Sequence, residues 1–152
     1  MPMQPFSIRI CNWDQARAEA RRIREQVFVQ EQGVPLELEM DEHDPHCDHA
    51  LALDAQGGVV GTGRLLPDGH IGRMAVLKAY RARGVGALLL QALMEQARKR
   101  GHARVCLKAQ VHAAGFYRRL GFEAVGTEFF EAGIPHVAMQ CDLISDRGRS
   151  AD

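Results

Sequence analysis

The sequence lacks a net charge, a long apolar run and a leader-like segment. Lys plus Arg and Asp plus Glu each number 19, so we expect no overall attraction to nucleic acid or to an anionic membrane. The longest apolar run, residues 85–90, ends at Gln91 and is far too short to span a bilayer. Residues 1–6 contain no basic segment followed by an apolar one. These absences predict a cytoplasmic protein that interacts with neither nucleic acid nor membrane.

Cysteine pairs are also missing. The four cysteines lie far apart and form no CxxC pair: Cys11, Cys47, Cys106 and Cys141. This spacing excludes a disulfide scaffold and a structural zinc ribbon, and it favours reduced thiols. Residues 43–49 hold three histidines, one cysteine and two aspartates, but their spacing fits no standard zinc pattern. The sequence therefore predicts a polar loop here and no metal.

The length and composition are those of one globular domain. The chain has 152 residues, of which 46% are hydrophobic and 25% charged, a balance that permits a real core but leaves little room for two. We predict a single domain over residues 1–144 and a mobile polar tail over residues 145–152. The oligomeric state stays open, a homodimer included.

Hydrophobic periodicity predicts a chain of mixed strands and helices. Strands are predicted at residues 6–11, 49–54, 59–66, 70–77, 105–109, 123–131 and 136–143. Helices are predicted from a cap at Asn12 or Asp14 to about Val29, from Val85 to a cap at Gly101, and at about residues 113–120. Residues 33–48 are predicted to form a long acidic loop. Because short turns join the second to fourth strands, we expect an antiparallel meander.

The sharpest motif is Arg-Ala-Arg-Gly-Val-Gly at residues 81–86, where a strand ends and a helix begins. Two glycines allow a ligand close to the backbone, and the free amides at a helix start suit a pyrophosphate. A Walker loop would need Gly-Lys-Ser/Thr, and a dinucleotide fingerprint would need a third glycine in an early βαβ unit; neither is present. Two interpretations remain, a helix start that merely contains glycine and a site for another nucleotide carrier such as coenzyme A.

Three patterns can be compared with known families. Residues 81–86 give Arg-x-x-Gly-x-Gly, residues 110–122 give Gln-Val-His-Ala-Ala-Gly-Phe-Tyr-Arg-Arg-Leu-Gly-Phe, and residues 133–139 give Gly-Ile-Pro-His-x-x-Met. With the order of elements, these patterns resemble the Gcn5-related N-acetyltransferase (GNAT) superfamily. The last pattern and residues 24–35 resemble its ElaA-like and YjcF-like bacterial branch. One departure is Gln110, where the superfamily often has asparagine.

The resemblance implies the GNAT acyl-CoA N-acyltransferase fold, an α/β fold with a mixed, mostly antiparallel sheet and helices on both faces. It also implies transfer of acetyl from acetyl-CoA, without a metal, to a primary amine that attacks directly. Backbone groups on a bulged or splayed strand would hold the pantetheine and the thioester oxygen, and amides at the helix start would hold the pyrophosphate. The cofactor-binding residues implied are Met74, Ala75, Val76, Arg81, Ala82, Arg83, Gly84, Val85, Gly86, Ala87, Gln110 and Tyr117.

Two proton-transfer roles follow from the chemistry. Tyr117 is the candidate general acid, because a phenol can return a proton to the departing thiolate; the alternative is a half-buried core aromatic. Glu31 is the first candidate for the general base, because it follows the first helix at the start of the acidic loop. The alternative is that Glu31 pairs with Arg64 or Arg73. His136 is a second-rank base candidate, with a surface histidine as its alternative.

The charges are unevenly distributed along the chain. No Lys or Arg occurs between Arg24 and Arg64, where nine carboxylates fall, and no Asp or Glu occurs between Asp68 and Glu95. An anionic donor at one end and a cationic acceptor at the other suit this arrangement, so we predict a small cationic amine as the acceptor.

Arg73 lies inside a predicted central strand, so its charge needs a partner. The alternatives are an ion pair with Glu39 or Asp41 and a contact with an acceptor carboxylate. Two other functions stay open for the whole chain. One is an acyl-CoA-binding sensor without turnover, and the other is an enzyme like the acyl-homoserine-lactone synthases, which resemble the chain around residues 27–29.

Overall fold

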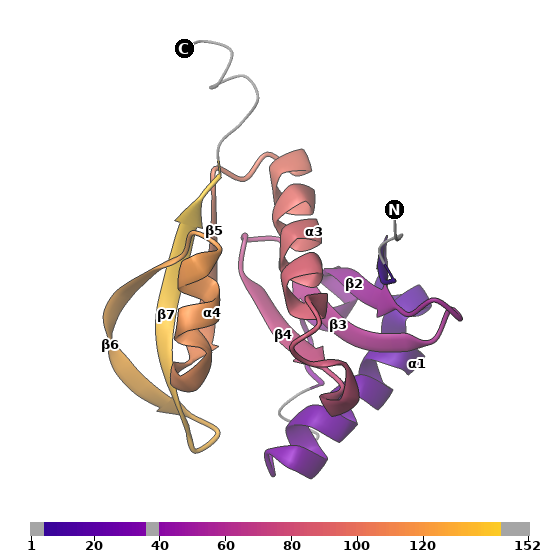
Figure 1. The fold of residues 1–152 in the computed structure, drawn as a ribbon. Coiled ribbons are helices and arrows are strands. Elements are labelled where there is room, and N and C mark those ends of the chain that lie inside the picture. Colours follow the sequence, from indigo (N-terminus) through magenta and orange to yellow (C-terminus); the bar gives the residue numbers. More distant parts are fainter. Residues whose placement is uncertain (1–4, 36–39, 144–152) are drawn as a thin grey trace.

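The computed structural model describes residues 5–35 and 40–143 (Figure 1). The elements are β1 (Ser7–Cys11), α1 (Trp13–Arg24), the π-helix η1 (Glu25–Glu31), the 3-10 helix η2 (Asp44–His46), β2 (Asp48–Leu53), β3 (Val59–Leu65), β4 (Ile71–Val76), the 3-10 helix η3 (Lys78–Tyr80), α3 (Val85–Lys99), β5 (Arg104–Gln110), the 3-10 helix η4 (Val111–Ala113), α4 (Ala114–Arg119), β6 (Glu123–Glu131) and β7 (Ile134–Asp142). Every strand and helix predicted from periodicity is present. The predicted tail, residues 145–152, lies outside the described residues.

The strands form two antiparallel sheets that separate from each other. One sheet has the order β1-β2-β3-β4 and contains the predicted meander, and the other has the order β5-β7-β6. Just before β4, His70 forms a parallel bridge with Cys106 of β5, the single isolated bridge among the described residues. Beyond that bridge the two strands diverge, as Figure 1 shows. The centre of the fold therefore contains a splay where backbone groups of β4 face an opening instead of a neighbouring strand.

Helix α1 begins at a capping box and continues directly into the π-helix η1. The Asn12 side chain accepts from the Gln15 amide at 3.0 Å, and the Gln15 side chain accepts from the Asn12 amide at 3.1 Å, a complete capping box. The helix then continues as η1 to Glu31, two residues past the predicted end. This π-helix buries Val27 and Phe28 and places Glu31 at the edge of the splay.

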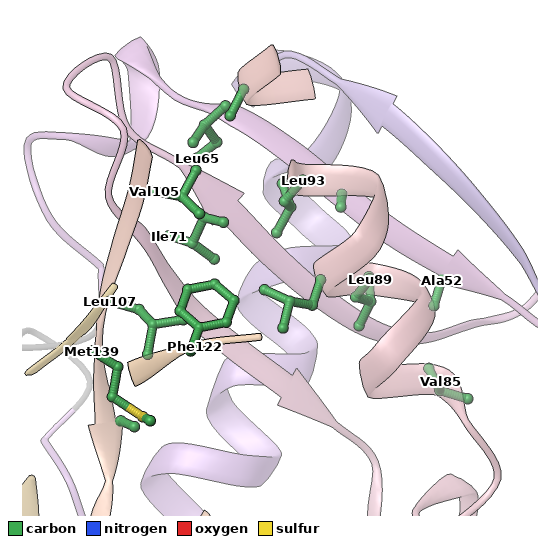
Figure 2. Close-up of a cluster of buried hydrophobic side chains, with 14 of the residues drawn as sticks. Ala52, Leu65, Ile71, Val85, Leu89, Leu93, Val105, Leu107, Phe122 and Met139 are labelled. Atoms are coloured by element: carbon green, nitrogen blue, oxygen red, sulfur yellow. The ribbon is translucent and has the colours of Figure 1, made fainter. Parts of the chain in front are cut away.

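Helices cover both faces of the sheets, which confirms the predicted fold class. On the face covered by α3 and α4, called the α3 face below, Leu89 and Leu93 pack with Leu107, Phe122 and Met139 (Figure 2). Each such buried side chain contributes about 1.5–3 kcal/mol through the apolar surface it removes from water. On the opposite face, called the α1 face below, α1 and η1 pack against β4. The two cores hold the strands on either side of the splay in place.

An ion network fixes the acidic loop to the sheet. Arg24 donates to both oxygens of Asp44 at 2.9 and 3.0 Å, and Arg64 donates to Asp44 at 2.8 Å. Arg64 also contacts Asp41 at 2.7 and 2.9 Å, and Arg73 contacts Asp41 at 3.0 Å. Asp41 is thus one of the two partners predicted for Arg73; the other, Glu39, lies outside the described residues. Arg24 and Asp44 are almost fully buried, so each charge depends on the others for compensation.

Two further observations concern the described part of the chain. None of its helices has both the length and the apolar character that crossing a bilayer would require. Within residues 5–35 and 40–143, no three His, Cys, Asp or Glu side chains are grouped closely enough to hold a metal ion. At the loop singled out above, Cys47 donates to the carbonyl of His43 at 3.2 Å, and His49 Nε2 contacts the carbonyl of Asp44 at 2.9 Å.

Candidate active site

Strand β4 is bulged at the splay. Thr62 pairs with Ala75 and Arg64 pairs with Gly72, so Gly63 alone faces two residues, Arg73 and Met74. Arg73 takes a left-handed conformation, with φ of 51°. Gly63 permits this geometry, because a Cβ atom there would lie 2.6 Å from the Met74 sulfur. The bulge and the splay are the two features that the resemblance associates with a thioester-binding strand.

A cavity of about 910 Å³ opens at the splay and is called the central cavity below. Its walls come from η1, β4, β5, α4 and β7, and they include Phe28, Met74, Gln110, Tyr117 and His136. Segments far apart in the sequence therefore meet at one hollow. Of the sequence-predicted site, the cavity walls contain Met74, Ala75, Val76, Arg81, Gln110 and Tyr117.

The start of α3 is an open cradle of backbone amides. Gly84, which precedes the helix, has φ of 85°, and no heavy atom lies within 4 Å of the position a Cβ would take. Among the described residues, none accepts a hydrogen bond from the amides of Val85, Gly86 or Ala87. Free amides and the positive end of the helix dipole favour an anion at this position. Ala82, in the turn before the helix, has φ of 61°.

The two arginines of this turn have protein partners. Arg81 donates to the carbonyl of Val76 at 2.9 Å and to both Glu31 oxygens at 2.9 and 2.7 Å. The Arg83 guanidinium lies 5.2 Å from the centre of the Phe6 ring and 5.6 Å from that of Tyr80. Such cation–π contacts hold the Arg83 side chain against the aromatic rings. The backbone of the turn, more than these side chains, is therefore open to a ligand.

The partner predicted for Glu31 is wrong. Arg64 and Arg73 were the predicted partners, whereas the structure pairs Glu31 with Arg81. Sequence distance gave no signal for this pair, because η1 and the turn before α3 meet only in the tertiary fold. The hydrogen bonds from Arg81 hold the pKa of the Glu31 carboxyl below its usual value. A carboxylate stabilised in this way is a weaker proton acceptor.

Tyr117 is a partly buried aromatic that also reaches the central cavity, and its role as general acid stays a prediction. Its ring packs edge-to-face on Phe116, with the ring centres 5.1 Å apart, and on Phe122 at 6.0 Å. The residue also lines the central cavity. Burial raises the pKa of the Tyr117 phenol to about 12, so the hydroxyl stays protonated throughout the neutral range. A protonated phenol at the cavity wall is the form that a general acid needs.

Gln110 takes part in a link that the sequence analysis missed. Its side-chain nitrogen donates to the Gln32 oxygen at 3.0 Å, and the Gln32 nitrogen donates to the Gln110 oxygen at 3.2 Å. This reciprocal amide pair joins the end of β5 to the segment after η1 across the central cavity. Gln32 carries no motif that could have identified it.

Four carboxylates of the acidic span are paired with arginines, Glu31 among them. Asp41 and Asp44 belong to the ion network described above, and Arg100 contacts Asp48 at 2.8 and 3.0 Å. Burial would raise the pKa of the Asp48 carboxyl, but hydrogen bonds from Arg100 and Gln96 and the Arg100 charge hold it below its usual value. The negative potential of this half is therefore smaller than the sequence suggests, because arginines distant in the sequence compensate it.

Comparisons with known proteins agree with this architecture. Over 128 residues, the chain is 39% identical to YjcF of Bacillus subtilis, an uncharacterized N-acetyltransferase; the match covers 82% of this chain and 91% of that protein. The structure of this chain is similar to that of an acyl-CoA N-acyltransferase from Pseudomonas aeruginosa, with a TM-score of 0.79 and 29% identity. The match covers 90% of this chain and 99% of that one. Escherichia coli ElaA gives a TM-score of 0.78 at 27% identity, with the same coverage.

A family model also matches most of the chain. The acetyltransferase (GNAT) domain model matches residues 15–143, which include the bulged strand, the start of α3 and the Tyr117 helix. The resemblance stated from the sequence motifs is thereby confirmed, including its ElaA-like and YjcF-like branch. The chain belongs to the Gcn5-related N-acetyltransferase family.

Proposed function

We propose that this protein transfers the acetyl group of acetyl-CoA to the primary amine of a small acceptor. The observation that carries the proposal is that the bulge of β4 and Tyr117 share one cavity, whose wall also contains Arg81 of the turn that leads to the free amides of Val85, Gly86 and Ala87. Family membership supports acyl transfer from an acyl-CoA donor. The proposal adds that the acyl group is acetyl and that the acceptor is an amine.

Different groups of the protein bind different parts of acetyl-CoA. The amides at the start of α3 hold the diphosphate, with the backbone of residues 81–87 around it. Backbone groups of Met74, Ala75 and Val76 pair with the pantetheine arm, and an amide at the bulge donates to the thioester oxygen as negative charge develops there. Gln110 reaches the arm once its pair with Gln32 opens. Each contact uses a backbone or amide group, so no metal is needed.

Proton transfer completes the reaction. The nitrogen of the free amine forms a bond to the carbonyl carbon and loses a proton to a base or to solvent, the carbon–sulfur bond breaks, and the Tyr117 hydroxyl gives its proton to the departing thiolate. Direct attack requires no covalent enzyme intermediate. Glu31 can serve as the base only while its pair with Arg81 is open, because that pair lowers its pKa.

The charge of the acceptor is a separate prediction. The acidic span favours a cationic amine, but its described aspartates at positions 41, 44 and 48 are paired with arginines. The cationic preference therefore depends on the remaining carboxylates of the span. It is tested by comparing polyamines, neutral amines and amino acids at low and high salt, because exposed charges are screened by salt.

The experiment is a panel of primary amines incubated with acetyl-CoA, with detection of free thiol. Release of thiol that depends on both the amine and the enzyme, with acetylated amine identified by mass spectrometry, is the expected result. Calorimetry with acetyl-CoA alone separates the alternative, a sensor without turnover. Tight binding with no product from any amine would favour the sensor.

A further inference from the structure

The mechanism proposed above lacks a strong proton acceptor for the amine. The described groups in the cavity walls that could accept a proton are mostly engaged. Asp41 is bound by two arginines, Glu131 contacts Lys108 at 3.2 Å, and Asp68 contacts His70 at 3.1 Å. The side chains of His43 and His70 are about half exposed, and His112 is exposed. Exposed histidines have no fixed direction in which to receive a proton.

His136 differs from these groups in both burial and orientation. Only 7% of its surface is exposed, and it lines the central cavity. Its Nδ1 atom lies 2.6 Å from the carbonyl oxygen of Ile134. A carbonyl can only accept, so Nδ1 carries the proton and donates, and the lone pair of the neutral ring is on Nε2. The ring also stacks on Phe129 with 5.9 Å between ring centres and 21° between planes.

The Nε2 atom of His136 is available for a substrate. No side chain or backbone group within residues 5–35 and 40–143 forms a hydrogen bond with it. The Nδ1 bond and the ring stack fix the tautomer and the plane of the ring. This is the arrangement by which a carbonyl orients a histidine that acts through its other nitrogen.

Strand register places His136 on the face opposite to Tyr117. His136 pairs with Gln110, whereas Val137 and Met139 belong to the core on the α3 face. Alternation along β7 therefore puts His136 on the α1 face, where Ile134, two residues earlier, packs against the η1 cluster. Tyr117 comes from α4, on the α3 face. Both side chains still line the same cavity, because the cavity passes between the diverging strands.

We infer that His136 is the general base of the acyl transfer, an inference that rests on the proposed function. An acceptor ammonium entering from the α1 face gives a proton to Nε2, and its nitrogen then forms the bond to the thioester carbonyl carbon. The carbon–sulfur bond breaks, the nitrogen gives its second proton to solvent, and the thiolate takes the proton of Tyr117 on the α3 face. The imidazolium then loses its proton to solvent, and solvent returns one to Tyr117. One proton is released overall for each amide formed.

The charged groups around His136 suit this role. Lys108 of β5 lies on the same face as Gln110. Glu131 of β6 forms an ion pair with Lys108. Glu31 of η1 and Arg81 of the turn before α3 form an ion pair, and Arg81 lines the same cavity. The exposed His112 of η4 also lines it. The four charged side chains named here form two ion pairs. The imidazolium therefore faces no uncompensated charge from them.

The kinetic test uses His136→Asn, with His112→Asn as a matched control in the same cavity wall. The asparagine amide can still donate to the Ile134 carbonyl, so the fold is maintained while Nε2 is lost. With the best amine of the panel, we expect kcat near pH 7 to fall about 100-fold, the size typical of one general base. The calorimetric affinity for acetyl-CoA should stay unchanged, and His112→Asn should retain normal turnover.

The pH profile separates a base from a structural residue. The deficit of His136→Asn should shrink as the pH approaches the pKa of the amine itself, about 10 for an alkylamine, because the solution then supplies the free amine. Normal turnover in the variant, or a deficit that is the same at every pH, would overturn the assignment.

A second measurement keeps the inference independent of finding an acceptor. Long-range ¹H–¹⁵N spectra of the ligand-free protein report which ring nitrogen of His136 carries the proton. We expect the Nδ1–H tautomer in the neutral ring. The opposite tautomer would place a proton on Nε2 and overturn the inference. If no amine is acetylated although acetyl-CoA binds, the proposed function fails while the tautomer result stands separately.

Discussion

The donor site can be tested by a charge placed at the start of α3. Gly84→Asp adds a carboxylate beside the free amides, and Gly84→Asn adds a neutral side chain of the same shape. Both substitutions raise the free energy of the folded state, because φ at this position is 85° and the new side chain must adopt a left-handed backbone conformation. Asn and Asp tolerate that conformation better than other side chains. Since no heavy atom lies within 4 Å of the added Cβ position, neither side chain meets a clash at that point.

The magnitude follows from Coulomb's law. A carboxylate about 5 Å from one phosphate charge is repelled by about 3 kcal/mol at an effective dielectric constant of about 20, and by about 1 kcal/mol in bulk water. The Kd for acetyl-CoA of Gly84→Asp should therefore exceed that of Gly84→Asn by about 5- to 150-fold, at 1.36 kcal/mol for each tenfold change. Added salt should reduce the difference, because the site is open to solvent.

The assay is isothermal calorimetry on both variants and on the original chain, with circular dichroism to establish that each is folded. The comparison between the two variants isolates the charge from the backbone cost. Equal affinities for Gly84→Asp and Gly84→Asn would refute the placement of the diphosphate at this turn.

Three further predictions concern the acid, the ion pair at the turn, and the ion network. Tyr117→Phe should keep acetyl-CoA affinity and lower kcat about 100-fold; normal turnover would assign the proton to water. Glu31→Gln should release Arg81 and tighten acetyl-CoA binding about 2- to 5-fold, the worth of an exposed pair, with turnover retained; weaker binding would contradict this. Asp44→Asn should cost about 3 kcal/mol of unfolding free energy at neutral pH by leaving buried guanidinium charge uncompensated. Because the arginines lower the pKa of Asp44 below its usual 3.8, urea titrations should show this deficit fully above about pH 4 and shrinking as the pH falls through the folded pKa; a deficit independent of acid would exclude the charge as its cause.

Local chemistry explains why so much of the fold could be predicted. The strands of the meander are short, apolar-rich segments between turns that contain glycine, and the α3 helix carries its apolar residues at helical spacing up to Gly101. These signals are confined to neighbouring residues, so they survive without knowledge of the rest of the chain. The phosphate-binding turn at residues 81–86 was identifiable for the same reason, because its glycines and the helix start are adjacent in sequence.

Long-range pairing explains what was missed. The Glu31 carboxylate meets Arg81, which is 50 residues away, and Gln110 meets Gln32, which is 78 residues away. No periodicity encodes such partners, because they depend on where the π-helix η1 ends and how far β4 and β5 diverge.

The sequence by itself determined the elements, their order, the family and the identity of the groups that can carry the chemistry. Only the tertiary structure decided which of those groups are free to act. The arginines at positions 24, 64 and 73 neutralise carboxylates that look unpaired in the sequence, and Arg81 occupies Glu31. The splay and the Ile134 carbonyl leave His136 buried, oriented and open at one nitrogen. The physical reason is that a charge or a lone pair acquires its function from neighbours in space, and those neighbours are set by packing.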